Sequence, residues 1–171
     1  SVKWGGGSRG STEHIAAAMI ARAVGVDAAK INYVPFRGGG EATAAILGGN
    51  VTVGGSGYSE FQQYIEAGKM KPIGVTSDVR LKGIDIPTLI EQGIPVEIGN
   101  WRGVYAAPGI TPARRRELTD MVVRATQSSA WQEALKKNNW TSAVMGGVKF
   151  EDFVDREFAA LRAVMVKAGM I

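Results

Sequence analysis

The sequence predicts an α/β fold in which a parallel or mixed sheet is connected by crossover helices. Short apolar segments typical of strands alternate with amphipathic segments typical of helices, which is the pattern of this fold class. Many of the 23 glycines follow directly after such segments, where the chain must turn. The chain has 171 residues, of which 45% are hydrophobic and 21% are charged, so it has the composition of a globular protein with one or two small domains.

Three strand-helix pairs are predicted in the first 70 residues. The strands share apolar or β-branched residues and are expected at Val2–Trp4, Ile31–Phe36 and Val51–Val53. The helices share an apolar face and are expected at Thr12–Val24, Glu41–Leu47 and Tyr58–Ala67. Gly68 is the expected C-terminal cap of the third helix. A further strand is expected at Lys71–Thr76, where Pro72 favours a sheet edge or the start of a strand.

The rest of the chain is predicted to be mostly helical. A short helix is expected near Thr88–Gln92, and extended segments are expected over Val96–Ala107. Three amphipathic helices follow, starting after Thr111, after Ser128 or Ser129, and near Phe150, the last of them ending near Lys167. The apolar positions expected to be buried in the first of these helices are Leu118, Met121, Val122 and Ala125. Only one weak strand, Thr141–Met145, accompanies them, so we expect part of the fold to come from outside this chain.

Composition excludes several kinds of site. The chain contains no cysteine and only one histidine, His14, so we expect no disulfide and no metal site. The net charge is +4, with 9 Lys and Arg against 9 Asp and Glu in residues 1–100, and 11 against 7 in residues 101–171. Because no aromatic residues alternate with Arg114–Arg116, we interpret this run as a solvated helical turn and expect no nucleic-acid binding.

The most informative segment is the glycine-rich stretch from Gly5 to His14, between a predicted strand and a predicted helix. Its glycines allow a tight turn and a close approach to a ligand, and Ser11 or Thr12 can cap the helix. The N-terminal N–H groups of a helix favour an anion, and Arg9 adds a donor suited to carboxylate or phosphate. The segment therefore predicts an anion-binding loop.

Enzymatic alternatives use the same segment. Gly5, Gly7 and Gly10 satisfy the dinucleotide pattern, and Arg37 could meet the 2′-phosphate of NADP, but Val2–Trp4 is short and polar for a central parallel strand. Ser11 stands where a phosphate-binding loop of the Walker type needs lysine. A hydrolase would pair Ser8 or Ser11 with His14, yet there is no nucleophile elbow and no clear orienting acid. We expect no catalytic residues.

Two other glycine-rich turns are expected at the same sheet edge as this loop. They are Phe36–Gly40 and Gly54–Tyr58, and they offer Arg37, Ser56 and Tyr58 as donors. Ligands of α/β sheets gather at the carboxyl ends of the strands. Three such turns at one edge favour a site that binds an acid and does not catalyse its conversion.

Several ordered runs resemble the substrate-binding proteins of tripartite tricarboxylate transporters. They are Gly7–His14, Tyr33–Gly39, Gly48–Val51, Ala67–Ser77, Arg80, Pro87–Gly93 and Asn100–Ile110. The chain departs from the family pattern at Thr52, where many members have aspartate, and at Gly54–Gly57, which replaces a bulkier loop.

The resemblance implies a periplasmic-binding-protein-like fold of type II, with two α/β lobes around a cleft. Residues 1–98 would then be the second lobe, and residues 99–171 would be the crossover and the C-terminal helices that return to the first lobe. The N-terminal part of the first lobe would be absent from this chain. The ligand-binding residues carried over are Gly7, Ser8, Arg9, Gly10, Ser11, Thr12, His14, Phe36, Arg37, Gly38, Ser56 and Tyr58.

The expected function is that of a non-enzymatic receptor which captures a small di- or tricarboxylic acid by hinge closure and delivers it to membrane transporter subunits. This receptor function needs no cofactor. The resemblance implies a periplasmic location and a monomer when intact, and no signal peptide is recognised in this chain. The alternative is an NADP-dependent Rossmann-type oxidoreductase that uses Gly5, Gly7 and Gly10.

Overall fold

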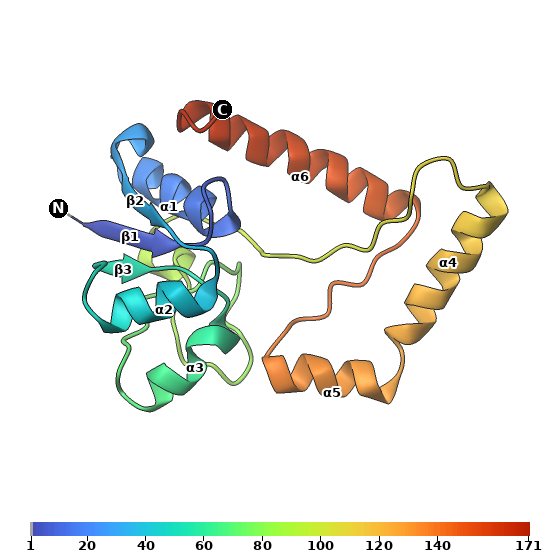
Figure 1. Cartoon of the computed structure of the whole chain (residues 1–171), viewed down its shortest axis with the longest axis horizontal. Helices are drawn as coiled ribbons and strands as arrows, with labels where there is room; N and C mark the ends of the chain where they lie inside the picture. The colour runs from blue at the N-terminus through green and yellow to red at the C-terminus, as the bar shows by residue number, and fades with distance from the viewer. Residues whose placement is uncertain (1) are drawn as a thin grey trace. The chain divides into compact units, whose positions relative to one another are not determined.

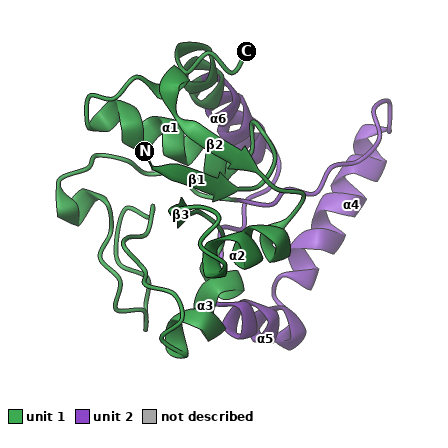
Figure 2. Cartoon of the chain, turned by 60° about the vertical axis from the view of Figure 1, so that its left-hand side comes forward, with its two compact units in different colours: residues 1–100, 160–171 green, residues 101–159 purple. Residues whose placement is uncertain are grey.

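The computed structural model describes residues 2–171, which divide into two compact units (Figures 1 and 2). One unit comprises the chain up to Asn100 together with Ala160–Ile171, and the other comprises Trp101–Ala159. The assignment of residues 1–98 and 99–171 to two lobes of a longer protein stays a prediction.

The first unit is built on a parallel three-stranded sheet with the order β2-β1-β3. The strands are β1 (Lys3–Gly6), β2 (Asn32–Pro35) and β3 (Val53–Gly54). The expectation that the first strand is too short and polar to be central was wrong. Lys3 is exposed at its start, whereas Gly5 and Gly6 are buried. The missing side chain of Gly5 leaves room for Val51 and Phe36 to approach the middle of the sheet.

Three helices follow the three strands, as the sequence predicts: α1 (Thr12–Ala23), α2 (Gly39–Leu47) and α3 (Tyr58–Glu66). Figure 1 shows that each helix begins directly after the turn that follows its strand. Gly68 has a left-handed φ of 68° just after α3, which confirms its predicted capping position. Fully buried alanines, including Ala17 and Ala18, line the inner face of α1. Ala18 packs with Ala28 and Ala168, so the C-terminal end of the chain belongs to this core.

The segment between α3 and Asn100 contains less regular structure than expected. The predicted strand Lys71–Thr76 was wrong, since only an isolated parallel bridge between Val75 and Thr88 forms there. Pro72 has no N–H to donate to a sheet. Ile98 instead donates its N–H to the Thr76 carbonyl (3.0 Å) and buries its side chain, and residues 96–107 form no strand.

A reciprocal capping box stabilises the short 3₁₀ helix Ile90–Gln92, where a short helix was predicted. The Thr88 N–H donates to Glu91 Oε2 (2.7 Å), and the Glu91 N–H donates to Thr88 Oγ1 (3.0 Å). The Thr88 backbone and the Arg80 guanidinium hold the pKa of Glu91 below its ordinary value.

The second unit contains α4 (Pro112–Ala125), α5 (Ser129–Asn138) and the first part of α6 (Val148–Lys167). The caps are those predicted, because Thr111 Oγ1 accepts from the Arg114 N–H and Ser128 Oγ accepts from the Trp131 N–H, both at 3.2 Å. The segment Thr141–Met145 forms no strand.

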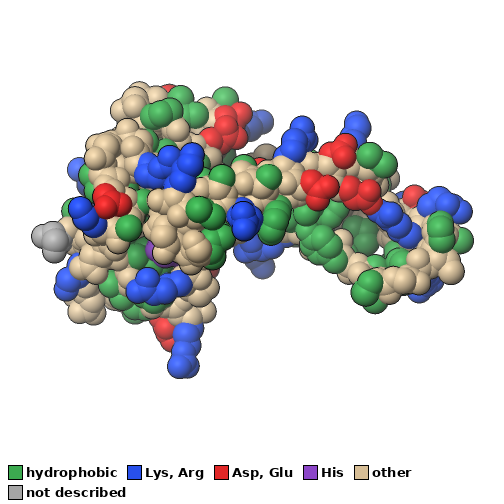
Figure 3. All heavy atoms as spheres, turned by 90° about the horizontal axis from the view of Figure 1, so that it is seen from above, with side chains coloured by type: hydrophobic (Ala, Val, Ile, Leu, Met, Phe, Trp, Pro, Cys, Tyr) green, Lys and Arg blue, Asp and Glu red, His purple; other side chains and the backbone are tan. Residues whose placement is uncertain are grey.

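No residue of these three helices is buried within the chain. The predicted burial of Leu118, Met121, Val122 and Ala125 was therefore wrong, and the Met121 side chain is 53% exposed. Apolar side chains lie open on the face seen in Figure 3. The amphipathic pattern is present, but the described residues supply no layer that covers it.

An aromatic cluster connects the first residue of the second unit to the start of α6. The Trp101 ring lies edge-on to Phe150 and Phe153, with ring centroids 6.1 and 5.3 Å apart. Its Nε1–H donates to Glu157 Oε2 at 3.3 Å. Trp101 therefore has a packing role within this unit.

Two glycines allow a matched test of local conformation. Gly40 lies inside α2 and Gly49 has a left-handed φ of 70°, and an added Cβ would meet nothing within 4 Å at either site. We expect Gly40→Ala to raise the free energy of unfolding by about 0.5–1 kcal/mol. We expect Gly49→Ala to lower it by about 1–2 kcal/mol, because alanine is strained at this φ. Urea titration measures both, and shifts of the same sign would contradict the assignment.

Candidate anion-binding site

Three turns meet at the carboxyl edge of the sheet, because the three strands are parallel neighbours. Beyond the strand ends, the Phe36 N–H donates to the Gly6 carbonyl (2.9 Å) and the Gly55 N–H donates to the Gly5 carbonyl (3.0 Å). These two bonds join the second and third turns to the glycines at the end of β1. The expected convergence of the three turns at one edge is therefore present.

The glycine loop between β1 and α1 is held by three hydrogen bonds. Tyr33 donates its O–H to the Gly7 carbonyl (2.9 Å), and the Gly10 N–H donates to His14 Nδ1 (3.1 Å). The Ser11 N–H donates to the Ser8 carbonyl (3.0 Å). Hydrogen bonds within the chain therefore define the shape of the loop.

The geometry favours glycine at two positions of the loop. Gly10 has a left-handed φ of 79°, which side chains rarely adopt. A Cβ on Gly7 would lie 3.0 Å from Glu13 Oε2 and 3.1 Å from Ser11 Oγ. Larger residues would change the path of the loop in front of α1.

The N-terminus of α1 faces this loop with an incomplete cap. Ser11 occupies the N-cap position, but its hydroxyl makes no capping hydrogen bond. Its Oγ is buried and has no hydrogen-bond partner within residues 2–171. Helix geometry leaves the first N–H groups of α1 without intrahelical acceptors. Rotation of Ser11 about χ1 would add a hydroxyl to these N–H donors.

His14 is buried, with 8% of its surface exposed, and has a structural role in the loop. Its ring stacks on Tyr33 with centroids 4.1 Å apart and an interplanar angle of 28°. Burial, and secondarily the Arg9 charge, lowers the pKa of His14 below 6.5. Because Nδ1 accepts from Gly10, the ring is neutral and protonated on Nε2. His14 Nδ1 is therefore not paired with Ser8 or Ser11, as a hydrolase would require at this nitrogen.

The first turns of α2 and α3 bring two carboxylates to the second and third turns, where the sequence interpretation did not place them. The Arg37 N–H donates to Glu41 Oε2 (3.1 Å), and the Ser56 hydroxyl is hydrogen-bonded to Glu60. Glu60 also lies against Gly39 in the first turn of α2. Glu41 and Glu60 each stand three residues after an N-cap glycine, which is the spacing of a capping box and the signal that could have identified them.

These contacts distinguish the predicted ligand residues from one another. The side chain of Arg37 is exposed, Gly38 is the N-cap of α2, and Tyr58 begins α3. Ser56 is engaged with Glu60, so it is not a free donor. Thr12 Oγ1 lies 3.4 Å from Asn100 Oδ1. The strongest anion-binding features at this sheet edge are therefore the N–H groups at the start of α1 and the Arg9 guanidinium beside them.

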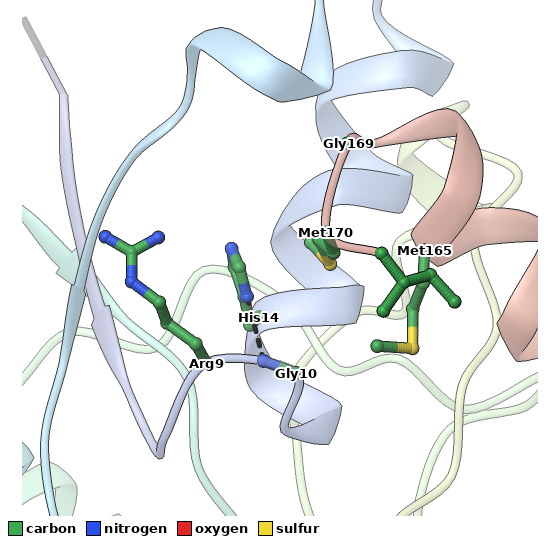
Figure 4. A pocket seen from close by; sticks show the side chains of 7 residues that line it. Arg9, Gly10, His14, Met165, Gly169 and Met170 are labelled. Carbon is green, nitrogen blue, oxygen red and sulfur yellow. Dashed lines mark hydrogen bonds between the residues drawn. The ribbon is translucent and has the colours of Figure 1, made fainter.

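A pocket of about 310 Å³ opens beside the loop (Figure 4). Its lining residues come from the loop, from α1 and from the C-terminal segment, and they are Arg9, Gly10, His14, Met165, Gly169, Met170 and Ile171. Figure 4 shows the His14 ring between Arg9 and the two methionines. Of the predicted ligand residues, only Arg9, Gly10 and His14 line this pocket. No sequence motif indicated the C-terminal residues, because their place depends on the packing of Ala168.

The dinucleotide interpretation does not fit the loop. Gly10 lies ahead of α1 in a left-handed turn, whereas the third glycine of that motif brings the helix close to the strand.

Within residues 2–171, no group of three or more His, Asp or Glu side chains could hold a metal ion. The same part of the chain contains no helix with the length and apolar character to cross a membrane.

Comparisons with known proteins agree on one family. A family model described as "Tripartite tricarboxylate transporter family receptor" matches residues 1–170. Protein BugT of Bordetella pertussis is 25% identical over 162 residues, which cover 94% of this chain and 49% of BugT. The chain thus spans about half the length of this relative.

Solved structures show the same fold. A TctC solute binding protein from Polaromonas is 31% identical with a TM-score of 0.75, over 98% of this chain and 57% of that one. The R. palustris protein Rpa4515, solved with adipate, is 24% identical with a TM-score of 0.83, over 99% of this chain and 56% of that one.

Proposed function

The chain belongs to the tripartite tricarboxylate transporter receptor family, and on this premise we propose that it is part of a non-enzymatic solute receptor that captures a small di- or tricarboxylic acid. The observation that carries the proposal is the hydrogen-bonded glycine loop at the N-terminus of α1, with Arg9 beside it. Loops of this kind offer several N–H donors to one anion.

Carboxylate recognition by this loop follows from its donors. One carboxylate group of the ligand accepts from the first N–H groups of α1, from the Ser11 hydroxyl and from the Arg9 guanidinium. Such charge-assisted bonds are stronger than neutral ones and offset the loss of water from the ligand. Glu13 lies on the Gly7 side of the loop, so the ligand binds on the side of Arg9 and Gly10. Phe36, Arg37, Gly38, Ser56 and Tyr58 border the ligand from the neighbouring turns.

We propose that residues 1–98 are the second of two lobes and that residues 99–171 return to the first lobe. Two observations support this organisation. The chain covers 49% of BugT and 57% of the Polaromonas protein, and α4, α5 and α6 have no buried residue within it. The N-terminal part of the first lobe then lies outside this chain, and hinge closure of the two lobes encloses the ligand.

The same family assignment motivates the rest of the proposal. The intact receptor is a periplasmic monomer that delivers its ligand to the membrane subunits of the transporter. It needs no cofactor and does not bind nucleic acid. The adipate complex of a protein with the same fold makes adipate the first probe.

A thermal-shift screen of the full-length receptor tests this function. The panel contains adipate, citrate, other di- and tricarboxylates, aromatic acids and NADP. A true ligand present at a hundredfold excess over its Kd should stabilise the native state by about 2.7 kcal/mol. Stabilisation by carboxylates alone is expected. A shift with NADP and none with the acids would overturn the proposal and favour the oxidoreductase.

A further inference from the structure

We infer that neutral His14 is a positioning residue that holds the glycine loop in its anion-binding shape, and that protonation of its ring releases the loop. The inference rests on the proposed function and adds a regulatory property to the same site. It assigns His14 a role through Gly10, with no direct contact to the ligand.

The first step is the hydrogen bond between the Gly10 N–H and His14 Nδ1, at 3.1 Å. His14 is the third residue of α1, the position from which glutamate reaches back to the N-cap N–H in a capping box, and its ring reaches one residue further, to the Gly10 N–H. Here an imidazole nitrogen takes the place of the carboxylate. A protonated imidazole has N–H donors on both nitrogens and accepts no hydrogen bond. Protonation therefore removes the hydrogen bond between Gly10 and His14, because the Gly10 N–H then faces a second N–H donor on His14 Nδ1.

The second step is the contact between His14 and Tyr33. The two rings stack, while Tyr33 holds the Gly7 carbonyl at 2.9 Å. Tyr33 thus fixes the start of the loop and His14 fixes its end. A displacement of the His14 ring would disturb both ends, because the stack joins them.

The surroundings favour the neutral ring. Arg9 faces it from the loop and the Tyr33 phenol faces it from β2, with Glu13 close to Tyr33. The C-terminal segment presents side chains that carry no charge, namely Met165, Met170 and Ile171. The pocket that these residues line gives solvent a route to the imidazole.

The sign of the pH effect follows from the lowered pKa of His14. The unfolded chain binds the proton first, at its ordinary pKa of 6.5, and the native state binds it only at lower pH. Stability from the neutral ring is therefore complete above pH 6.5 and decreases as the pH falls towards the native pKa. Carboxylate affinity falls in the same direction, since the loop is released.

The direction of the pH effect on affinity distinguishes a positioning role of His14 from direct contact between His14 and the ligand. A histidine that touched the carboxylate would bind it more tightly when protonated, because opposite charges attract. A positioning histidine gives weaker binding at low pH. The affinity should fall by up to about tenfold for each pH unit below the native pKa.

Two substitutions in the full-length receptor test the inference. His14→Asn puts an acceptor oxygen at the position of Nδ1 and cannot titrate in this range. His14→Phe keeps a ring against Tyr33 but has no acceptor. The readouts are the NMR signals of the His14 ring nitrogens and the Gly10 amide without ligand, and the Kd for adipate between about pH 5 and pH 8.

We expect the wild-type Gly10 amide to shift with the titration of His14 and the adipate Kd to rise as the pH falls. His14→Asn should bind adipate at a nearly constant Kd, apart from the titration of adipate itself, which affects both proteins equally. His14→Phe should bind weakly at every pH.

A Gly10 amide that ignores the His14 titration would overturn the inference whatever the binding data show. Tighter adipate binding at low pH would also overturn it. If Gly10 follows His14 but no carboxylate of the panel binds at pH 8, the proposed function fails and the loop coupling stands.

Discussion

Arg9→Ala is expected to weaken carboxylate binding by the full-length receptor by about 10- to 100-fold. Arg9 is exposed and lines the pocket beside Gly10 and His14. A hydrogen bond to a charged group contributes about 1.5–3 kcal/mol, and a guanidinium can donate two to one carboxylate. Titration calorimetry with adipate, or with the acid identified by the screen, measures the change in Kd.

Arg22→Ala is the matched control for this effect. Arg22 is also exposed and lies in the last turn of the same helix, so its removal changes the net charge equally. The Kd should change little in this variant. An Arg9→Ala receptor that binds as tightly as the wild type would remove Arg9 from the site. Equal losses in both variants would indicate a general charge effect and no specific contact.

Tyr33→Ala is expected to lower the free energy of unfolding by about 3–5 kcal/mol, which is the usual cost of truncating a buried aromatic residue. The Tyr33 side chain is 5% exposed, stacks on His14 and donates to the Gly7 carbonyl. Burial raises the pKa of its phenol, which is consistent with a neutral donor. Urea unfolding monitored by circular dichroism measures the loss.

Tyr33→Phe separates packing from hydrogen bonding in this prediction. The ring and its stack remain, and only the O–H donor to Gly7 is removed, so a loss of about 0.5–1.5 kcal/mol is expected. Gly7 would then be held less firmly, and the adipate Kd should rise as well. If Tyr33→Ala destabilised the chain no more than Tyr33→Phe, the ring would not be a core contact.

Local signals in the sequence predicted most helices and the common edge of the three turns. Thr111 and Ser128 cap α4 and α5, and Gly68 follows α3 in a left-handed conformation. Capping and left-handed turns depend on residues within four positions of each other, so they can be derived from sequence alone.

Longer-range features were predicted less well. Lys71–Thr76 has strand-like composition, but only its residue Val75 pairs, through a single bridge to Thr88. Strand formation requires a partner strand, and composition does not show whether one is available. The same reason explains β1, whose central position follows from two buried glycines that admit neighbouring side chains.

The sequence by itself determined the α/β class, the glycine loop before α1 and the family to which the chain belongs. Only the tertiary structure decided which donors of that edge are available. It brings Tyr33 to Gly7 across 26 positions of the chain, and it places Glu60 of α3 against Gly39 of α2. Whether a polar group is free or occupied depends on contacts between segments that only folding brings together.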